Sequence, residues 1–175
     1  EINVVAFRTR SDEMGGAAWM GIRPTKPFGS FRRGGLNFNA YAVSNTAGLS
    51  TGNGGNINAN GQFNNFWNGF VGVGINNAFA AYSDRDARGG PAVFQPRRIQ
   101  GWTGFEGDSR RPVAPSFNAF GGRRLDGLGN NWNLRAGAQV RIGGQLNGSV
   151  NLSYGRNIDD QQWLGNFVDS GRTSY

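Results

Sequence analysis

NWNLRAGAQVR, residues Asn131 to Arg141, alternates apolar and polar side chains with a period of two. One side of the alternation carries Trp132, Leu134, Ala136, Ala138 and Val140, and the other carries Asn133, Arg135, Gly137, Gln139 and Arg141. This period predicts a β-strand with one apolar and one polar face. The stretch also has the length of a strand that crosses a lipid bilayer at a tilt.

The same alternation recurs along the chain and predicts antiparallel strands joined by turns. The clear strands are Gly35–Val43, Asn56–Asn64, Phe66–Ile75 and Leu146–Tyr154, and the weaker ones are Ile2–Thr9, Gly15–Arg23, Ile99–Gly107 and Val113–Gly121. No stretch is long and apolar enough for a membrane-spanning helix. The chain opens with strand-like residues and no signal peptide, so we expect a mature chain or an internal piece.

Connections of two lengths are predicted between these strands. Short turns are expected near Asn64–Asn65, Asp108–Pro112 and Gly143–Gln145, and longer loops over Thr46–Gly55 and Ala78–Pro96. The Gly- and Asn-rich stretch Thr51–Asn60 is interpreted as a flexible loop that runs into a strand. Short turns at one end of a sheet and long loops at the other are typical of outer-membrane barrels.

Composition excludes several kinds of chemistry. The chain has no His and no Cys, which removes thiol nucleophiles, histidine bases and the usual zinc ligands. We therefore expect no catalytic residues, no metal site and no cofactor. The net charge of +7 comes mostly from arginine doublets rather than from one basic stripe. This distribution favours anionic lipid head groups or an anionic solute as partners, and argues against nucleic acid.

The polar residues of the alternation distinguish a membrane barrel from a soluble sandwich. They are mainly Asn, Gln, Ser and Gly with some Arg, whereas a solvent-exposed sheet face usually carries more Lys and Glu. Aromatic residues gather near strand ends, as in the interfacial girdles of barrels, at Phe28, Phe31, Phe66, Trp67, Trp132, Tyr154 and Trp163. The expected fold is all-β: an antiparallel up-and-down transmembrane β-barrel, or a barrel segment of about nine to ten strands. Residues 1–175 are treated as a single region, a fragment of a larger barrel.

Two groups of residues are candidates for a site. The residues expected to face a water-filled lumen and its solute are Asn58, Asn60, Gln62, Arg135, Gln139, Arg141 and Asn151. Rings of arginine can select anions, although the same side chains could simply pair with carboxylates across the lumen. The second group is a loop cluster of Asp84, Arg85, Asp86 and Arg88, which could bind an ion or solute but is better explained by hydrogen bonds that fix the loop. Calcium at Asp84 and Asp86, or at Asp159 and Asp160, would need several further oxygen ligands.

Several motifs resemble those of a known family. They are FNNFWNGFVGVG at Phe63–Gly74, YSDRDARGGP at Tyr82–Pro91, EGDSRRPVAP at Glu106–Pro115, NNWNLRAGAQVRI at Asn130–Ile142 and QQWLG at Gln161–Gly165. They resemble the barrel region of bacterial envelope proteins of unassigned function, which join an N-terminal carbohydrate-binding-like β-sandwich to a C-terminal outer-membrane barrel. The resemblance implies that this chain is part of the barrel. The sandwich is absent here, so sugar binding is not carried over.

The function expected from the sequence is that of a non-catalytic protein of the bacterial outer membrane. It would act as a pore or transport-like barrel, or as a scaffold in an envelope complex, in contact with outer-membrane lipid or lipopolysaccharide. Other envelope proteins or further strands of the same barrel are expected partners. The alternative is a secreted structural or adhesive β-protein, such as a fibre subunit, and a small hydrolase built on Asp and Glu is remote.

Overall fold

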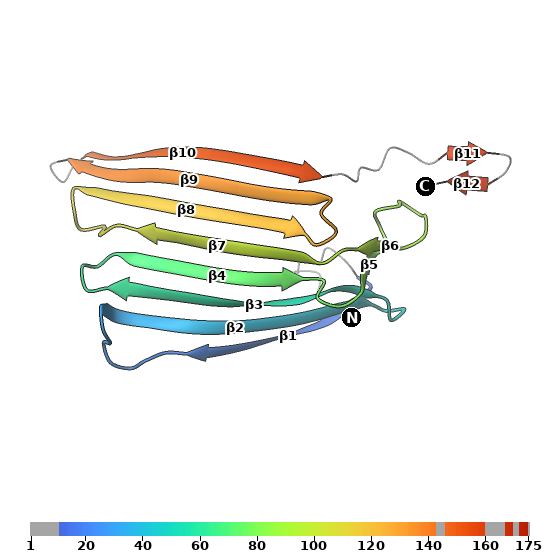
Figure 1. Ribbon diagram of the computed structural model, residues 1–175, viewed down its shortest axis with the longest axis horizontal. Coiled ribbons are helices and arrows are strands. Elements are labelled where there is room, and N and C mark those ends of the chain that lie inside the picture. Colours follow the sequence, from blue (N-terminus) through green and yellow to red (C-terminus); the bar gives the residue numbers. More distant parts are fainter. Residues whose placement is uncertain (1–10, 143–145, 160–166, 170–171, 175) are drawn as a thin grey trace.

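The computed structural model describes residues 11–142, 146–159, 167–169 and 172–174, and these form an all-β fold with no helix. Eight strands make one antiparallel sheet (Figure 1). They are β1 (Glu13–Ile22), β2 (Phe31–Asn45), β3 (Ser50–Phe63), β4 (Asn68–Asn76), β7 (Arg98–Glu106), β8 (Val113–Arg124), β9 (Gly129–Ile142) and β10 (Leu146–Asp159). The predicted all-β, antiparallel class is therefore confirmed.

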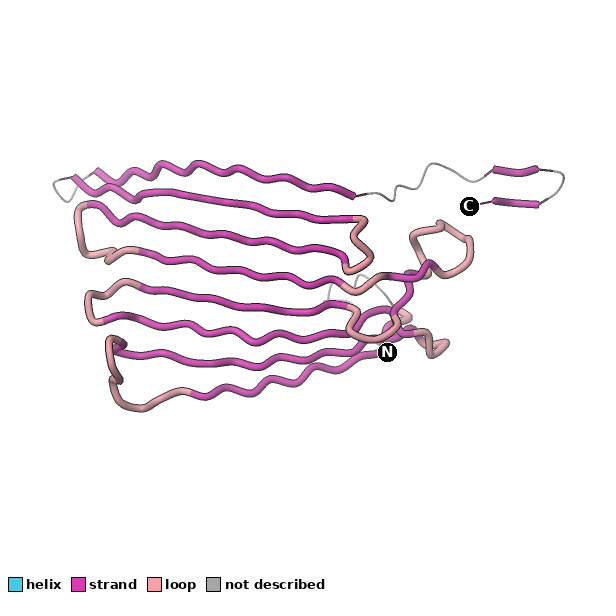
Figure 2. The backbone as a smooth tube through the Cα atoms, in the orientation of Figure 1, coloured by secondary structure: helices cyan, strands magenta, loops and turns pink. Residues whose placement is uncertain are grey.

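The sheet is an up-and-down meander in the order β1-β2-β3-β4-β7-β8-β9-β10. Two small hairpins accompany it: β5 (Ala81–Ser83) with β6 (Val93–Gln95), and β11 (Phe167–Asp169) with β12 (Arg172–Ser174). Figure 2 shows the first hairpin as an insertion at one end of the sheet. We call this the insertion end; it also holds the connections 46–49 and 125–128. The opposite end, with connections 23–30, 64–67 and 107–112, is called the turn end.

Eight predicted strands are confirmed, with ends that differ by up to six residues, and one predicted loop is wrong. Residues 46–49 form a tight turn, in which the Gly48 N–H donates to the Asn45 carbonyl at 2.9 Å, and β3 begins at Ser50. The predicted long loop Thr46–Gly55 is therefore wrong from residue 50 onward, and the Gly- and Asn-rich stretch Thr51–Asn60 lies wholly within the strand β3. Its glycines serve close packing, because a Cβ on Gly54 would lie 3.1 Å from the Tyr41 ring. Ile2–Thr9, Gly143–Gln145 and Gln161–Gly165 lie outside the described residues.

The described strands do not close into a barrel. β1 and β10 are the two edges of the sheet and pair only with β2 and β9, respectively. The main sheet has eight strands, fewer than the nine to ten expected for the barrel segment.

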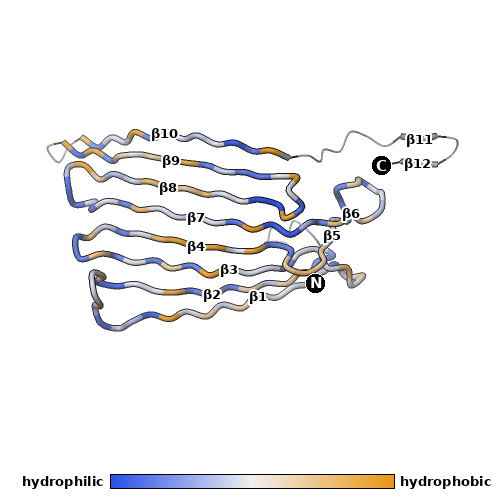
Figure 3. The backbone as a smooth tube through the Cα atoms, viewed as in Figure 1, coloured by the Kyte–Doolittle hydropathy of each residue, from blue (hydrophilic) through white to orange (hydrophobic). Residues whose placement is uncertain are grey.

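The register aligns the alternation of neighbouring strands, so that the sheet has one apolar and one polar face. Directly paired residues lie on the same face, as in the row Met20–Phe38–Ile57–Val73. We call this the apolar face; Figure 3 shows the alternating hydropathy along the strands. The other side, with rows such as Asn37–Asn58–Gly72, is called the polar face.

No second layer covers the apolar face within the described part of the chain. Val71 is 56% exposed although it lies in the body of the sheet, and Leu152 on the edge strand β10 is 73% exposed. Among these residues only Ala81 and Ala87 are buried apolar side chains, and both belong to the insertion. The described residues include no helix that is long and apolar enough to cross a membrane.

Candidate functional site

The polar face brings side chains from separate strands into rows that run across the sheet. One row near the turn end is Arg33–Gln62–Asn68–Glu106–Ser116, contributed by β2, β3, β4, β7 and β8. The predicted residues Asn58, Asn60 and Gln62 occupy three successive polar-face positions of β3. A single strand therefore supplies one member to each of several rows.

Amide side chains of β2 and β3 form a hydrogen-bonded network on this face. Asn37 Nδ2 donates to Asn58 Oδ1 at 2.9 Å and to Asn60 Oδ1 at 3.3 Å. Asn39 Nδ2 and Asn58 Nδ2 both donate to Asn56 Oδ1 at 2.9 Å. An amide carries two donors and two acceptor sites, so these residues hold each other in place and keep further hydrogen-bonding capacity.

The network continues towards the insertion end. The Tyr41 hydroxyl donates to Asn76 Oδ1 at 2.9 Å, and Asn76 Nδ2 donates to Gln100 Oε1 at 3.2 Å. Also on β7, the Arg98 guanidinium reaches across β8 and donates to Asn131 Oδ1 of β9. Polar side chains thus meet across β2, β4, β7 and β9, which gives the face a fixed arrangement of donors and acceptors.

A hollow of about 530 Å³ opens on the polar face near the turn end. Its side-chain lining combines two guanidiniums, three amides, a carboxylate and a phenyl ring, from Arg23, Arg33, Asn60, Gln62, Asn68, Glu106 and Phe70. Guanidiniums bind anionic oxygens through paired hydrogen bonds, and amides donate to or accept from neutral polar groups. The hollow is therefore suited to a polar solute with at least one anionic group.

The remaining predicted lumen residues lie on the polar face at the other side of the sheet. Arg135, Gln139 and Arg141 project from β9, and Asn151 of β10 lies beside Gly137 of β9. β3 and β9 are four strands apart, so these residues are about 19 Å from the β3 group at the usual strand spacing. The structure places all seven on one face, but in two separate groups.

Several polar-face residues were not predicted from the sequence, above all Arg98, Gln100 and Trp102 of β7. The alternation of this strand is masked, because Trp102 lies on the polar face and Thr103 on the apolar face. Trp102 covers Gly72 of β4, where a Cβ would overlap the indole ring. The Thr103 hydroxyl donates to the Phe70 carbonyl at 3.0 Å, which satisfies it on the apolar side. A bulky residue over a glycine on the next strand is not visible in the sequence of either strand.

The loop cluster lies in the insertion, at the end of the sheet opposite the polar hollow. Asp84 Oδ2 accepts a hydrogen bond from Asn45 Nδ2 at 3.0 Å, and Asp86 Oδ2 accepts one from Gln95 Nε2 at 2.7 Å. Arg85 lies 3.4 Å from Asp12.

The backbone of the same loop is bent at Arg88, which has a φ of 47°. Arg88 N–H donates to the Arg85 carbonyl at 2.9 Å. The Asp84 carboxylate thus joins the insertion to β2, whereas the Asp86 carboxylate and the turn at Arg88 join parts of the insertion to each other. Within the described residues, no group of three or more Asp, Glu, His or Cys could hold a metal ion, and Asp160 lies outside them.

Comparison with known proteins identifies the family and nothing more specific. No curated protein and no solved structure matches the chain. The family described as a domain of unknown function, DUF5916, matches residues 1–173. Since the match extends over nearly the whole sequence, the chain belongs to the DUF5916 family.

Proposed function

We propose that this chain forms part of the wall of a bacterial outer-membrane β-barrel, with its apolar face towards lipid and its polar face towards a water-filled lumen. In this proposal the protein is not an enzyme. It passes or docks a polar solute, or holds an envelope complex together. The polar hollow is the first place at which a solute would be bound.

The observation that carries the proposal is the exposed apolar face. Its side chains lie in the middle of a regular sheet, yet Ile57 is 47% exposed, Val71 56% and Leu134 40%. A soluble protein rarely leaves so large a contiguous apolar surface open to water. Hydrocarbon would accept this surface without a second protein layer.

Aromatic side chains border the apolar face near the turn end. We call Phe28, Phe31, Phe63, Trp67, Phe105 and Phe117 the aromatic row; its ring centroids lie 5.3 Å apart for Phe28–Phe31, 4.6 Å for Phe31–Phe63, 5.5 Å for Trp67–Phe105 and 5.9 Å for Phe105–Phe117. On the same face, the rings of Trp132 and Tyr154 lie 5.0 Å apart in a tilted arrangement nearer the insertion end. Aromatic belts at the two interfaces are typical of membrane barrels.

The positions of charged residues on the apolar face agree with this orientation. Among the described strand residues whose side chains share this face, the charged ones are Arg123 and Arg156, both close to the insertion end. Between them and the aromatic row the face is free of charge. Strands of nine to fifteen residues are long enough to cross the hydrocarbon layer at a tilt.

The open edges of the sheet set a condition on the proposal. In hydrocarbon every backbone N–H and C=O needs a partner, so an uncovered edge strand is not stable there. The outer edges of β1 and β10 must therefore pair with further strands, from the same protein or from another chain. The eight strands would then be one sector of a larger wall.

Single-cysteine labelling tests which solvent each face meets, because the chain has no natural Cys. The full-length protein would carry Leu134→Cys or its neighbour Arg135→Cys, each coupled to a small fluorophore and studied in lipid vesicles. We expect brominated lipids to quench the label at position 134 and aqueous iodide to quench the label at position 135. The pair Val150→Cys and Asn151→Cys repeats the comparison on β10.

Equal quenching of neighbouring positions by iodide would contradict the proposal. Recovery of a monomer from the aqueous phase without detergent would contradict it too. Detergent-free assemblies in which position 134 is shielded from both quenchers would instead support a fibre subunit, with apolar faces packed between sheets.

A further inference from the structure

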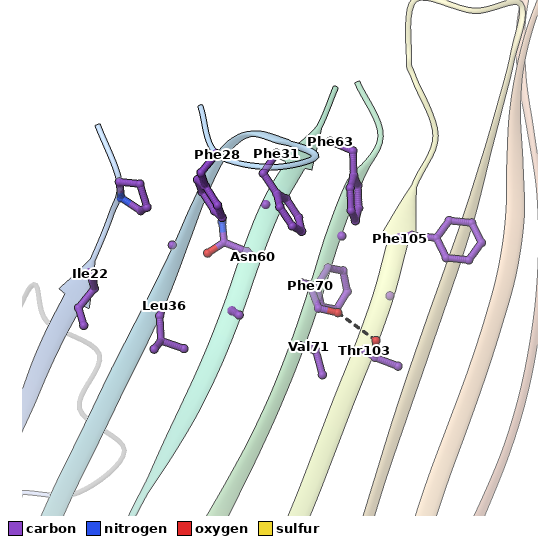
Figure 4. A pocket seen from close by; sticks show the side chains of 17 residues that line it. Ile22, Phe28, Phe31, Leu36, Asn60, Phe63, Phe70, Val71, Thr103 and Phe105 are labelled. Atoms are coloured by element: carbon purple, nitrogen blue, oxygen red, sulfur yellow. Dashed lines mark hydrogen bonds between the residues drawn. The ribbon is translucent and has the colours of Figure 1, made fainter. Parts of the chain in front are cut away.

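A groove of about 580 Å³ indents the apolar face beside the aromatic row (Figure 4). Its walls include Ile22, Leu36 and Val71, and three rings of the aromatic row stand along its edge at the turn end: Phe28, Phe31 and Phe63. The lining is almost entirely carbon. It therefore offers contacts to an apolar chain and hardly any hydrogen bonds.

Glycines make room for this groove. A Cβ on Gly61 would lie 2.9 Å from the Phe31 ring, and one on Gly69 would lie 3.2 Å from the Phe63 ring. Each ring thus lies against the backbone of the next strand, where any larger residue would push it outward. A backbone hydrogen bond also joins the chain segments that carry these rings: Asn64 N–H, next to Phe63, donates to the carbonyl of Ser30, next to Phe31, at 2.9 Å.

Cationic side chains gather directly beyond the row, at the turn end. The guanidinium carbons of Arg32 and Arg110 lie 3.9 Å and 3.3 Å from the centroid of the Phe66 ring. Two cations cannot approach one ring centre so closely from the same side, so they lie on opposite faces of Phe66. The backbone of Phe66 adopts the left-handed conformation that is rare for residues other than glycine, with a φ of 68°.

The charges of this cluster are only partly neutralised. Asp108 accepts hydrogen bonds from Arg110 Nε and Nη2, both at 2.8 Å, and lies 4.0 Å from Arg111. Arg32 has no carboxylate within ion-pair distance among the described residues. The side chains of Arg110 and Arg111 are 59% and 71% exposed and can reach an outside anion.

We propose that the groove and this cation cluster together bind one anionic glycerophospholipid. An acyl chain lies in the groove between Leu36, Val71 and the rings. The phosphate lies at the edge of the Phe66 ring, where Arg32 and Arg110 reach it from the two faces of that ring. Guanidiniums match the geometry of a phosphate and bind it through paired hydrogen bonds. The inference rests on the proposed membrane location and adds the lipid class and its site.

The position of the cluster favours a phospholipid over lipopolysaccharide. The described connections at the groove end have four to eight residues, whereas the longest one, residues 77–97 with the β5–β6 hairpin, lies at the opposite end of the sheet. In outer-membrane barrels short turns face the periplasm and long loops face outward. The inner leaflet, which lies on the periplasmic side, is made of phospholipid.

Native mass spectrometry of the delipidated full-length protein in detergent tests the site directly. The probes are phosphatidylglycerol, phosphatidylcholine with the same acyl chains, and lipid A, each added alone. We expect one phosphatidylglycerol to be retained more strongly than phosphatidylcholine or lipid A. Losing one interfacial cation in Arg32→Gln should weaken phosphatidylglycerol retention about fivefold, with Arg32→Lys less affected.

Two further variants separate the groove from the charges. Ala59→Leu fills the groove without adding polarity and should lower retention of phosphatidylglycerol, whereas Ala119→Leu on the same face outside the groove should not. Arg123→Gln, at the insertion end, is the matched charge control. Far-UV circular dichroism of each variant shows whether the sheet is retained.

Equal retention of phosphatidylglycerol and phosphatidylcholine would overturn the lipid site. Unchanged retention of phosphatidylglycerol in folded Arg32→Gln, or in folded Ala59→Leu, would overturn it as well. Preferred retention of lipid A would overturn the choice of phospholipid. If any of these results is obtained while quenching still distinguishes position 134 from position 135, only the lipid site fails. If that contrast is absent, the barrel wall itself is wrong.

Discussion

Individual glycines decide where large rings can lie on this sheet. Gly72 of β4 is buried beneath the indole of Trp102 on β7. The same arrangement occurs at Gly61 beneath Phe31. These positions have no room for a side chain, even though nothing in their backbone conformation demands glycine. A ring over a glycine of the next strand also fixes how the two strands are aligned, since a shift of one residue would move the ring to the other face.

Gly72→Ala should lower the free energy of unfolding by about 1–3 kcal/mol, because the new methyl group must displace the rigid Trp102 ring. Urea unfolding of the full-length protein in lipid vesicles, followed by Trp fluorescence, would measure the change. Gly148→Ala is the matched control, since a Cβ there meets nothing within 4 Å and should change stability by less than about 0.5 kcal/mol. Equal effects of the two substitutions would show that the ring contact is unimportant.

At the scale of elements, the turn between β7 and β8 is stabilised by one carboxylate. Besides its bond to the Arg110 side chain, Asp108 Oδ1 accepts the Arg110 backbone N–H at 3.0 Å, and the Asp108 carbonyl accepts Arg111 N–H at 3.0 Å. The side-chain hydrogen bond from Arg110, followed by the backbone one, lowers the pKa of Asp108 to about 2. The same pairing raises the pKa of Arg110.

This shift predicts how the turn responds to acid. The pKa of Asp108 is lower in the folded protein than in the unfolded chain. Its contribution is therefore complete above the ordinary value of 3.8 and is lost as the pH falls through about 2. The difference in unfolding free energy between wild type and Asp108→Asn should accordingly shrink between about pH 5 and about pH 2. A difference that is unchanged over this interval would show that the ion pair does not stabilise the turn.

At the scale of the whole molecule, the polar face carries more arginine than carboxylate. Among the described side chains of the main sheet, five arginines share it, Arg33, Arg98, Arg124, Arg135 and Arg141, against Glu13 and Glu106. If this face lines a lumen, anions are concentrated there and cations are depleted. Such a lumen would prefer anionic solutes.

Arg135→Gln should reduce the anion preference of the full-length protein in planar bilayers. A unit charge about 8 Å from a permeating ion contributes about 0.5 kcal/mol in water, which is about a twofold effect on each ion. Because the anion loses and the cation gains, the ratio of anion to cation permeability should fall about fivefold. Reversal potentials in a salt gradient measure this ratio. Arg123→Gln, on the apolar face, should leave it unchanged, and the same shift in both variants would argue against a lumen on the polar side.

The amino-acid sequence alone determined the strands and the two faces of most of them. Alternation is a local property of an extended chain, so Leu134 and Arg135 could be assigned to opposite faces without knowledge of any partner strand. For the same reason Asn58, Asn60, Gln62, Gln139 and Asn151 could be placed on the polar side. Alternation is hidden at Trp102 and Thr103, and the many glycines of Thr51–Asn60 resemble a loop. At these places the pattern within one strand does not predict the structure.

Only the tertiary structure decided which strands lie side by side and in what register. The polar hollow needs Arg33, Asn68 and Glu106 from three strands at one level, and the groove needs Phe31 to lie over Gly61 of its neighbour. These relations depend on the backbone hydrogen-bond ladder between strands that are distant along the chain. The pattern within one strand does not specify that ladder, which is why both cavities and the Arg32–Phe66–Arg110 cluster could be found only in the folded molecule.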